Sequence, residues 1–413
     1  MEQLKAVARG GQGGRRIVAV GAGKGGAGVS MAVANLGIFL AQIGKRVVLI
    51  DADFTGGGLH AWLGMRRPAV GISDVVAGRV ARIQSALSET PVTGLFLLGG
   101  AGDLLGSTTG ESQIARHLLT EMRSLEFDFV LVDLPAGVSP LAIELFAGTD
   151  AGIVVAVPAP DAVESTYRFL SAVFLHLVRI SPEADAASSA AIERLAHRDG
   201  SPPCPREVVA ALQEAASPLV ARARQLQSLF APQLIVNQTR IKIDEELGEA
   251  IVSAAARWLG FAPRLLGSIG WDDNVWLSLR RGLPLFIEFS RSGACRNLER
   301  IVRRFLGQEF KDLLAPVAVP PLTVEQNLYE LLEIYPGASE EDVRRALKRV
   351  RDWFGPDGLA VRGACTDEER REYQQLAAEA HGRLLDRSRR REYDRSHFPD
   401  GFRPPAERAP GAR

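Results

Sequence analysis

From residue 16 to residue 310 the chain alternates short apolar runs with segments of helical spacing. The runs are Ile17–Val20, Val47–Ile50, Leu95–Leu98, Phe129–Val132, Gly152–Val157, Leu234–Val236 and Leu265–Ile269. Most are continuously apolar and do not alternate with polar residues, which is typical of a strand buried on both faces. The pattern predicts an α/β fold over residues 15–314, with a mostly parallel sheet sandwiched by helices.

Composition divides the rest of the chain. Residues 181–230 interrupt the rhythm with Ala-rich stretches around a turn-like D-G-S-P-P, so we expect a helical insertion there. Residues 315–322 contain prolines typical of a linker, and residues 323–398 predict a small helical domain. We expect residues 1–14 to be flexible, and residues 399–413, rich in Pro, Gly and Arg, to form a disordered tail.

We expect three helices in the small domain. The first surrounds Leu328–Leu332, the second opens at Ser339, and the third covers roughly residues 367–385. Ser339, followed by Glu340 and Asp342, is a helix-start signal. The apolar positions after it keep helical spacing: Val343, Ala346, Leu347 and Val350.

The segment richest in candidate chemistry is RIVAVGAGKGGAGVSMAVAN, residues 16–35. An apolar strand, a glycine-rich loop and a helix follow one another, an order that lets backbone N–H groups converge on a phosphate. In the P-loop pattern G-x-x-x-x-G-K-[ST], Gly23, Gly28 and Ser30 are in register, but Val29 replaces the lysine. Lys24 lies early in the loop. We predict a nucleotide site with weakened hydrolysis.

Aspartates follow at the ends of predicted strands, where α/β sheets bind ligands. Asp51 and Asp53 share one strand face by their spacing, so both are candidates to approach a metal ion and a water. Asp133 ends a later strand, and residues 135–137 after it form a turn able to sense a γ-phosphate. Ser30 is placed to offer its hydroxyl to Mg²⁺. The structural alternatives are a helix-capping serine and surface aspartates.

Charge and cysteine content narrow the function classes. Lys and Arg together number 49, as do Asp and Glu, so the formal net charge is zero and favours neither nucleic acid nor acidic lipid. Cys204, Cys295 and Cys365 form no C-x-x-C pair, which argues against zinc, an iron–sulfur site or a disulfide framework. We find no apolar run of about 18 residues and no secretory signal, and expect a cytoplasmic protein.

Together these motifs resemble the MinD/ParA family of deviant-Walker ATPases, in its MinD-like branch that includes the flagellar-number ATPases. The matching segments are GKGGAGVS, NLGIFLAQIG (35–44), VVLIDAD (47–53), GISDVV (71–76), DLPAG (133–137), VNQ (236–238) and GLPL (282–285). The resemblance implies ATP or ADP with Mg²⁺, and a homodimer that forms on ATP binding.

The resemblance also assigns roles to matched positions. Lys24 resembles the signature lysine that reaches the partner's phosphates, Asp53 the water-orienting aspartate of switch I, and Asp133 the aspartate of switch II. Magnesium would be held by Ser30, Asp51 and Asp133. Nucleotide would be bound by Gly23, Lys24, Gly25, Gly26, Ala27, Gly28, Val29, Ser30, Met31 and, at the adenine, Asn237.

Two positions depart from the family pattern. Valine at position 29 supplies no charge-assisted contact to phosphate. The asparagine of switch I falls at about Gly58, inside T-G-G-G-L (55–59). Both changes weaken hydrolysis more than binding, so turnover by this candidate ATPase should be slow or absent.

Residues 326–398 resemble a DnaJ-type J-domain through NLYELLEI (327–334), PGASEEDVRRA (336–346) and AEAHGRLLDRSRRREYD (378–394). The His-Pro-Asp of that family is Gly355-Pro356-Asp357 here, so we expect a J-like docking module without co-chaperone activity. Its basic face, with Arg344, Arg345, Lys348 and Arg349, is either a site for an acidic partner or a solvated surface.

Several functions stay open. The first is a nucleotide-dependent dimeric switch that recruits a protein partner and positions a cellular structure; the second is a pseudo-ATPase scaffold that joins partners through the J-like domain. A metabolic relative, such as an amidotransferase, synthetase or iron–sulfur carrier, is disfavoured because paired cysteines and a Cys/His constellation are missing. No specific nucleic-acid binding is predicted.

The helix at 298–306 is either an ordinary surface helix, which we favour, or a peripheral contact at the inner face of the membrane.

Overall fold

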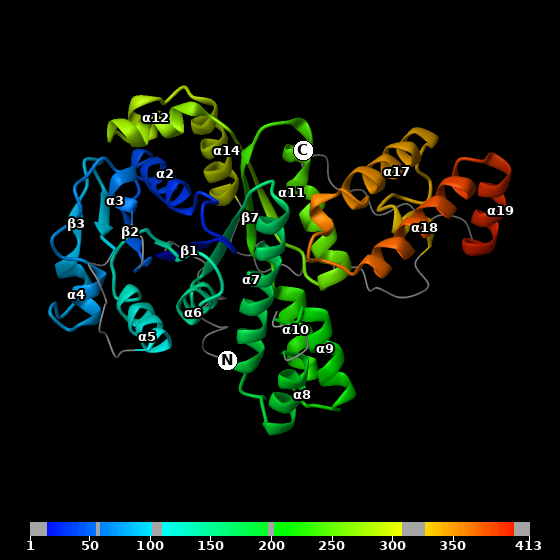
Figure 1. Ribbon diagram of the computed structural model, residues 1–413, viewed down its shortest axis with the longest axis horizontal. Helices are drawn as coiled ribbons and strands as arrows, with labels where there is room; N and C mark the ends of the chain where they lie inside the picture. The colour runs from blue at the N-terminus through cyan, green and yellow to red at the C-terminus, as the bar shows by residue number, and fades with distance from the viewer. Residues whose placement is uncertain (1–14, 55–57, 101–109, 197–201, 308–326, 400–413) are drawn as a thin grey trace. The chain divides into compact units, whose positions relative to one another are not determined.

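A computed structural model describes residues 15–54, 58–100, 110–196, 202–307 and 327–399 (Figure 1). The chain separates into two compact units, one up to Pro320 and one from Pro321. The sequence-based expectations for residues 1–14, the linker at 315–322 and nearly all of the tail lie outside the described residues.

The first unit contains an eight-stranded sheet in the order β3-β4-β2-β5-β1-β6-β7-β8. All neighbouring strands are parallel except β3 and β4, which are antiparallel. The strands are β1 (Arg16–Gly21), β2 (Val47–Asp51), β3 (Ser88–Glu89), β4 (Leu95–Leu98), β5 (Phe129–Asp133), β6 (Ala151–Ala156), β7 (Gln233–Thr239) and β8 (Arg264–Gly270). The predicted α/β fold with a mostly parallel sheet is confirmed; only the two-residue β3 was not predicted.

Helices cover both faces of this sheet (Figure 1). On one face α2 and α14 pack against each other, and on the other α5, α6 and α7 pack in series. The helices that flank the sheet are α2 (Val29–Gln42), α3 (Leu59–Trp62), α4 (Ile72–Val76), η1 (Ile83–Ala86), α5 (Glu111–Met122), α6 (Pro140–Gly148), α7 (Pro160–Arg179), α11 (Lys242–Ala254), η2 (Ala255–Leu259), α12 (Asp273–Arg281), α13 (Leu285–Glu288) and α14 (Gly293–Gly307).

The region between α7 and β7 forms a helical group of its own. Its members are α8 (Ala186–Ala196), α9 (Pro205–Glu214) and α10 (Val220–Leu229). Helices α9 and α10 contact α7. This is the region in which the sequence predicts an insertion, and it leaves the strand order of the sheet uninterrupted.

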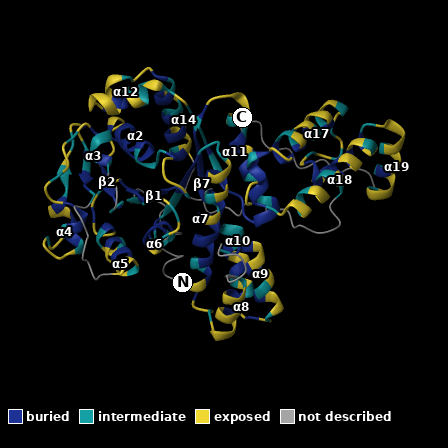
Figure 2. Cartoon of the chain, in the orientation of Figure 1, coloured by how far each residue is buried: buried dark blue, intermediate teal, exposed yellow. Residues whose placement is uncertain are grey.

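The core of the first unit lies between the sheet and its helices, where Figure 2 shows buried residues. Helix α14 contributes Leu298, Ile301, Val302 and Phe305, all of them at most 5% exposed, to this core. Its apolar face therefore packs against the sheet, as the surface-helix interpretation expects, and is not presented to a bilayer. None of the described helices combines the length and the apolar character needed to cross a membrane.

The second unit consists of α16 (Leu328–Leu331), α17 (Glu340–Phe354), η3 (Leu359–Val361), α18 (Asp367–Leu384) and α19 (Arg387–His397). The hydroxyl of Tyr393 accepts the N–H of Leu328 at 2.7 Å, and the hydroxyl of Tyr329 donates to Asp394 at 2.6 Å. These bonds join the first helix of the unit to the last.

Arg344 and Arg345 of the basic face pair with Glu340 and Glu341 one turn earlier, so part of that face is neutralised within the helix.

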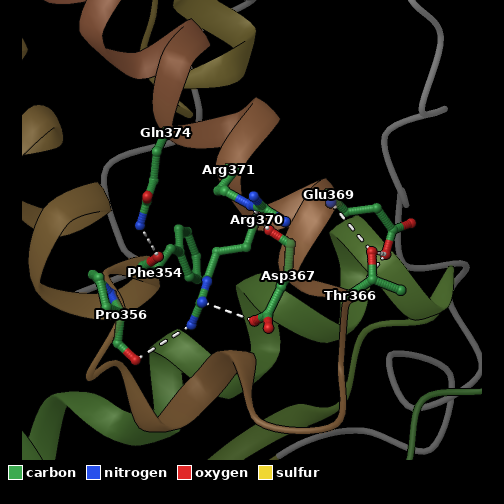
Figure 3. Close-up of polar contacts among 8 residues, drawn as sticks. All are labelled: Phe354, Pro356, Thr366, Asp367, Glu369, Arg370, Arg371 and Gln374. Atoms are coloured by element: carbon green, nitrogen blue, oxygen red, sulfur yellow. Dashed lines mark hydrogen bonds and ion pairs between the residues drawn. The ribbon is translucent and has the colours of Figure 1, made fainter.

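The loop after α17 is held by side chains of α18 (Figure 3). Gln374 donates to the carbonyl oxygen of Phe354 at 3.0 Å, and Arg370 donates to that of Pro356 at 3.3 Å and to Asp367 at 2.8 Å. A Cβ on Gly355 would overlap the carbonyl oxygen of Arg351. The observed loop therefore has no room for a side chain at position 355.

Candidate nucleotide-binding site

The P-loop consists of the end of β1, a glycine-rich loop and the start of α2. Gly26 and Gly28 have φ angles of 83° and 88°, a left-handed conformation that L side chains rarely adopt. At Gly23 the constraint is space, because a Cβ there would overlap the carbonyl oxygen of Ser165 in α7. The loop thus follows a path that requires glycine at all three positions.

A cavity of about 450 Å³ lies against this loop, a volume in the range of small-ligand sites. The P-loop, the carboxyl ends of β5, β7 and β8, and the segments that follow β2, β5 and β8 line it, together with residues of α3 and α12. It brings together most of the residues that the sequence predicts for the site: Lys24, Gly25, Gly26, Ala27, Gly28, Val29, Ser30, Met31, Asp53, Asp133 and Asn237. Gly23 and Asp51 do not belong to the lining.

Lys24 lines the cavity, and a carboxylate of the same chain holds its ammonium group. The Nζ atom pairs with Asp161 in the first turn of α7, and this hydrogen bond is the main reason that the pKa of Asp161 is lowered. The two side chains are 50% and 60% exposed, so solvent screens the pair and makes it weak. Breaking this ion pair therefore costs little free energy.

Val29 is the first residue of α2 and lines the cavity at the position of the P-loop lysine. Its side chain is partly buried and packs against the core between the sheet and α2. Position 29 therefore contributes an apolar contact and no charge. The described geometry leaves backbone N–H groups, the hydroxyl of Ser30 and Lys24 as the P-loop's own donors in the cavity.

Asp51 and Asp133 end neighbouring strands, and their Cα atoms are paired in the register of β2 and β5. Asp51 is fully buried; its carboxylate accepts the N–H groups of Asp53 at 3.3 Å and Leu59 at 3.1 Å. Burial raises its pKa to about 6. Strand β2 ends at Asp51, so the strand alternation that predicts a shared face for Asp51 and Asp53 does not reach Asp53. Of these two residues, only Asp53 lines the cavity.

Asp133 is 2% exposed, and burial raises its pKa to about 8, a shift that a hydrogen bond from Ser30 opposes. Its Oδ2 atom has no hydrogen-bond partner among the described residues. A buried, unpartnered carboxylate oxygen beside a serine hydroxyl fits Mg²⁺, which takes oxygen ligands. Ser30 and Asp133 would hold such an ion, which would supply charge neutralisation for phosphates.

Two further observations concern metals. In the described ranges no group of three or more His, Cys, Asp or Glu side chains could hold a metal ion. The three cysteines are free and lie in separate segments, at the N-cap of α9, in α14 and before α18.

The two segments predicted to act as switches differ in how far the structure describes them. Residues 55–57 lie outside the described part of the chain, and Gly58 is the N-cap of the short helix α3. In the turn after β5, Gly137 has a φ of 89° and donates its N–H to the carbonyl oxygen of Ala22 at 2.9 Å. The turn predicted to sense a γ-phosphate is thus bonded directly to the start of the P-loop.

Several cavity residues were not predicted from the sequence. Gln238 follows Asn237, and Trp62, Trp271 and Trp276 form an aromatic part of the wall. Trp271 comes directly after β8, at the same edge of the sheet as the aspartates, and that position was the available signal. Asn237 donates to the carbonyl oxygen of Ala27 at 2.8 Å, a contact with the P-loop that its predicted adenine role did not include.

Comparison with known proteins agrees with this geometry. A family model described as "ParA: NUBPL iron-transfer P-loop NTPase" matches residues 14–173. A putative septum site-determining protein MinD of Chlorella vulgaris is 25% identical over 304 residues, covering 73% of this chain and 89% of that protein. The septum site-determining protein MinD of Bacillus subtilis (strain 168) is 31% identical over 154 residues, which cover 37% of this chain and 57% of the relative.

The chain is also similar to two solved structures. MinD of Pyrococcus horikoshii OT3, complexed with Mg-ADP, is 18% identical, with 71% of this chain and 96% of that chain covered and a TM-score of 0.46. A putative plasmid partition protein of Borrelia burgdorferi B31 bound to AMPPNP is 16% identical, with coverage of 72% and 100% and a TM-score of 0.47. The family model, the curated relatives and the P-loop geometry together support the assignment of the α/β unit to the MinD/ParA family of P-loop NTPases.

Proposed function

We propose that this chain is a MinD/ParA-like switch that binds ATP or ADP with Mg²⁺, closes into a homodimer when ATP is bound, and then recruits a protein partner that positions a cellular structure. The observation that carries the proposal is the cavity formed by the P-loop, Ser30, Asp133 and Asp53 at the carboxyl edge of a parallel sheet. The curated relatives are named for determining the septum site, which supports a positioning role.

Hydrolysis in this proposal is slow or absent. Lys24, Asp53 and Asp133 would act on the phosphates and the attacking water, with Lys24 leaving Asp161 to reach the second copy. Val29 adds no charge at the γ-phosphate, and charge-assisted hydrogen bonds are among the strongest contacts a phosphate receives. Without that charge, binding relies on backbone N–H groups and Lys24, and hydrolysis is weakened more than binding.

The test combines nucleotide affinity with oligomeric state. Calorimetry should show saturable binding of ADP and ATP in the presence of Mg²⁺, and light scattering should show a dimer with ATP and a monomer with ADP. Lys24→Ala should abolish the dimer while keeping ADP binding. The absence of saturable binding at millimolar nucleotide would refute the proposal, and ATP-dependent assembly that survives Lys24→Ala would refute the switch.

The second candidate is a pseudo-ATPase scaffold that joins partners through the J-like unit. The lack of room at Gly355 favours it, because the loop that carries histidine in J-domains is shaped here around glycine. We propose that this unit docks a partner without stimulating a chaperone. A chaperone ATPase assay with added protein should show no stimulation, and stimulation comparable to that by a DnaJ-type protein would contradict the idea.

A further inference from the structure

Two consecutive side chains of β7 bind the P-loop from the same side. The amide of Asn237 donates to the carbonyl oxygen of Ala27 at 2.8 Å, and the amide of Gln238 donates to that of Gly26 at 3.0 Å. Consecutive side chains of a regular strand point to opposite faces of the sheet. A regular β7 could therefore not make both contacts.

A bulge in β7 makes the pair possible. The register between β7 and β8 shifts between Asn237 and Thr239, and Gln238 has a φ of 61°. Bulges re-aim side chains, and a left-handed backbone at a residue other than glycine is strained. The strained residue at this position is the one whose amide reaches the P-loop, 212 residues away in the chain.

The two contacts fix the direction of two peptide groups. In a planar trans peptide the carbonyl oxygen and the N–H of the next residue point in opposite directions. The carbonyl groups of Gly26 and Ala27 face the β7 amides, so the N–H groups of Ala27 and Gly28 face away from them. Neither N–H has a protein acceptor in the part of the chain that the structure describes. Both residues line the cavity.

The packing leaves this arrangement little freedom. A Cβ on Gly28 would overlap the amide nitrogen of Asn237, so that amide lies in the space that the glycine leaves open. The side-chain oxygen of Asn237 accepts the N–H of Gln238 at 2.9 Å, which fixes the orientation of the amide. Asn237 is 4% exposed.

We propose that Asn237 and Gln238 are positioning residues that turn the N–H groups of Ala27 and Gly28 toward the phosphates of the ligand. The proposal rests on the proposed nucleotide binding and deepens it. Because position 29 carries no charge, phosphate binding by the P-loop depends more on backbone N–H groups. The amides of Asn237 and Gln238 determine where two of these N–H groups point. The part of the ligand recognised in this way is its phosphate chain, whatever the base.

The test uses the full-length chain and three probes: ADP, pyrophosphate and adenosine. Gln238→Gly removes the amide and accepts the φ of 61° without strain, and Gln238→Met keeps the length and the neutral charge but loses the N–H donor. Ile243→Ala, an exposed position in the following helix, is the matched control. Affinities come from calorimetry, with adenosine measured by competition, and melting temperatures report on folding.

Both Gln238 variants should bind ADP and pyrophosphate about three- to tenfold more weakly, the range of one hydrogen bond. Adenosine affinity and the control should not change. An equal loss for adenosine would mean general damage, and an unchanged affinity for ADP would mean that the amide does not position the donors; either result overturns the inference. Wild-type protein that fails to bind ADP would instead refute the proposed function, so the two failures are separable.

Discussion

Asp133 makes the stability of the ligand-free protein depend on pH in a direction opposite to that of most carboxylates. Burial raises the pKa of this carboxyl to about 8, whereas an unfolded aspartate titrates near 4. Between these values the folded protein keeps a proton that the unfolded chain has lost. Unfolding therefore releases a proton, and the free energy of unfolding falls as the pH rises toward 8. Asp133→Asn removes this dependence because an amide does not titrate.

The magnitude follows from the size of the pH interval. One proton released on unfolding changes the free energy of unfolding by about 1.4 kcal/mol per pH unit. From pH 5 to pH 7, wild-type protein should lose about 2–3 kcal/mol relative to Asp133→Asn. Asp51, with a pKa raised to about 6, adds to the wild-type trend and is present in both proteins. Comparing the two proteins at each pH isolates the contribution of Asp133.

Urea-induced unfolding followed by far-ultraviolet circular dichroism at pH 5, 6 and 7, without nucleotide or magnesium, provides the measurement. The difference between the two proteins should grow with pH and favour the asparagine variant. Asp128→Asn, on the exposed turn before β5, serves as a control that should show no such growth. A constant difference across the range would mean that Asp133 is already ionised in the folded protein, and the burial argument would be wrong.

Three further predictions address the site and the second unit. Val29→Lys should strengthen ADP binding about tenfold or more and raise steady-state ATP turnover, because it adds a charge-assisted bond to phosphate; unchanged turnover would show that another step limits hydrolysis. Asp161→Asn releases Lys24 and should lower, by a few-fold, the protein concentration at which ATP gives half dimer by light scattering, while Glu164→Gln in the same turn should not. Tyr393→Phe leaves the buried N–H of Leu328 without an acceptor and should destabilise the second unit by about 1–3 kcal/mol in thermal unfolding, whereas Tyr335→Phe, at an exposed ring, should have no effect.

The sequence supports a prediction of the sheet because most of its strands are buried on both faces. Seven apolar runs stand out for that reason, and all seven are strands. The edge strand β3 has only two residues and pairs with one antiparallel neighbour. It is too short to contain an apolar run, so the sequence pattern does not predict it. Helix α19 is rich in arginine and buries only Tyr393, so its sequence lacks the apolar periodicity from which a helix is predicted.

In the candidate site, too, local sequence patterns were predictable and long-range contacts were not. The P-loop and the strand-end aspartates are local patterns, and the cavity brings most of them together. The partners of those residues are not local: Asp161 lies 137 residues from Lys24, and Gln238 lies 212 residues from Gly26. The bulge at Gln238 contains no glycine, and nothing in the sequence V-N-Q-T (236–239) indicates that the strand is irregular there. Such contacts depend on tertiary structure and could not be predicted from spacing.

Three of the five tryptophans of the chain, Trp62, Trp271 and Trp276, line the cavity. Trp258 is buried elsewhere in the same unit, and Trp353 lies in the other unit. Most of the indole side chains of this protein therefore lie in the wall of the cavity that a ligand would enter. Occupancy can be followed in real time on unlabelled protein by quenching or spectral shift.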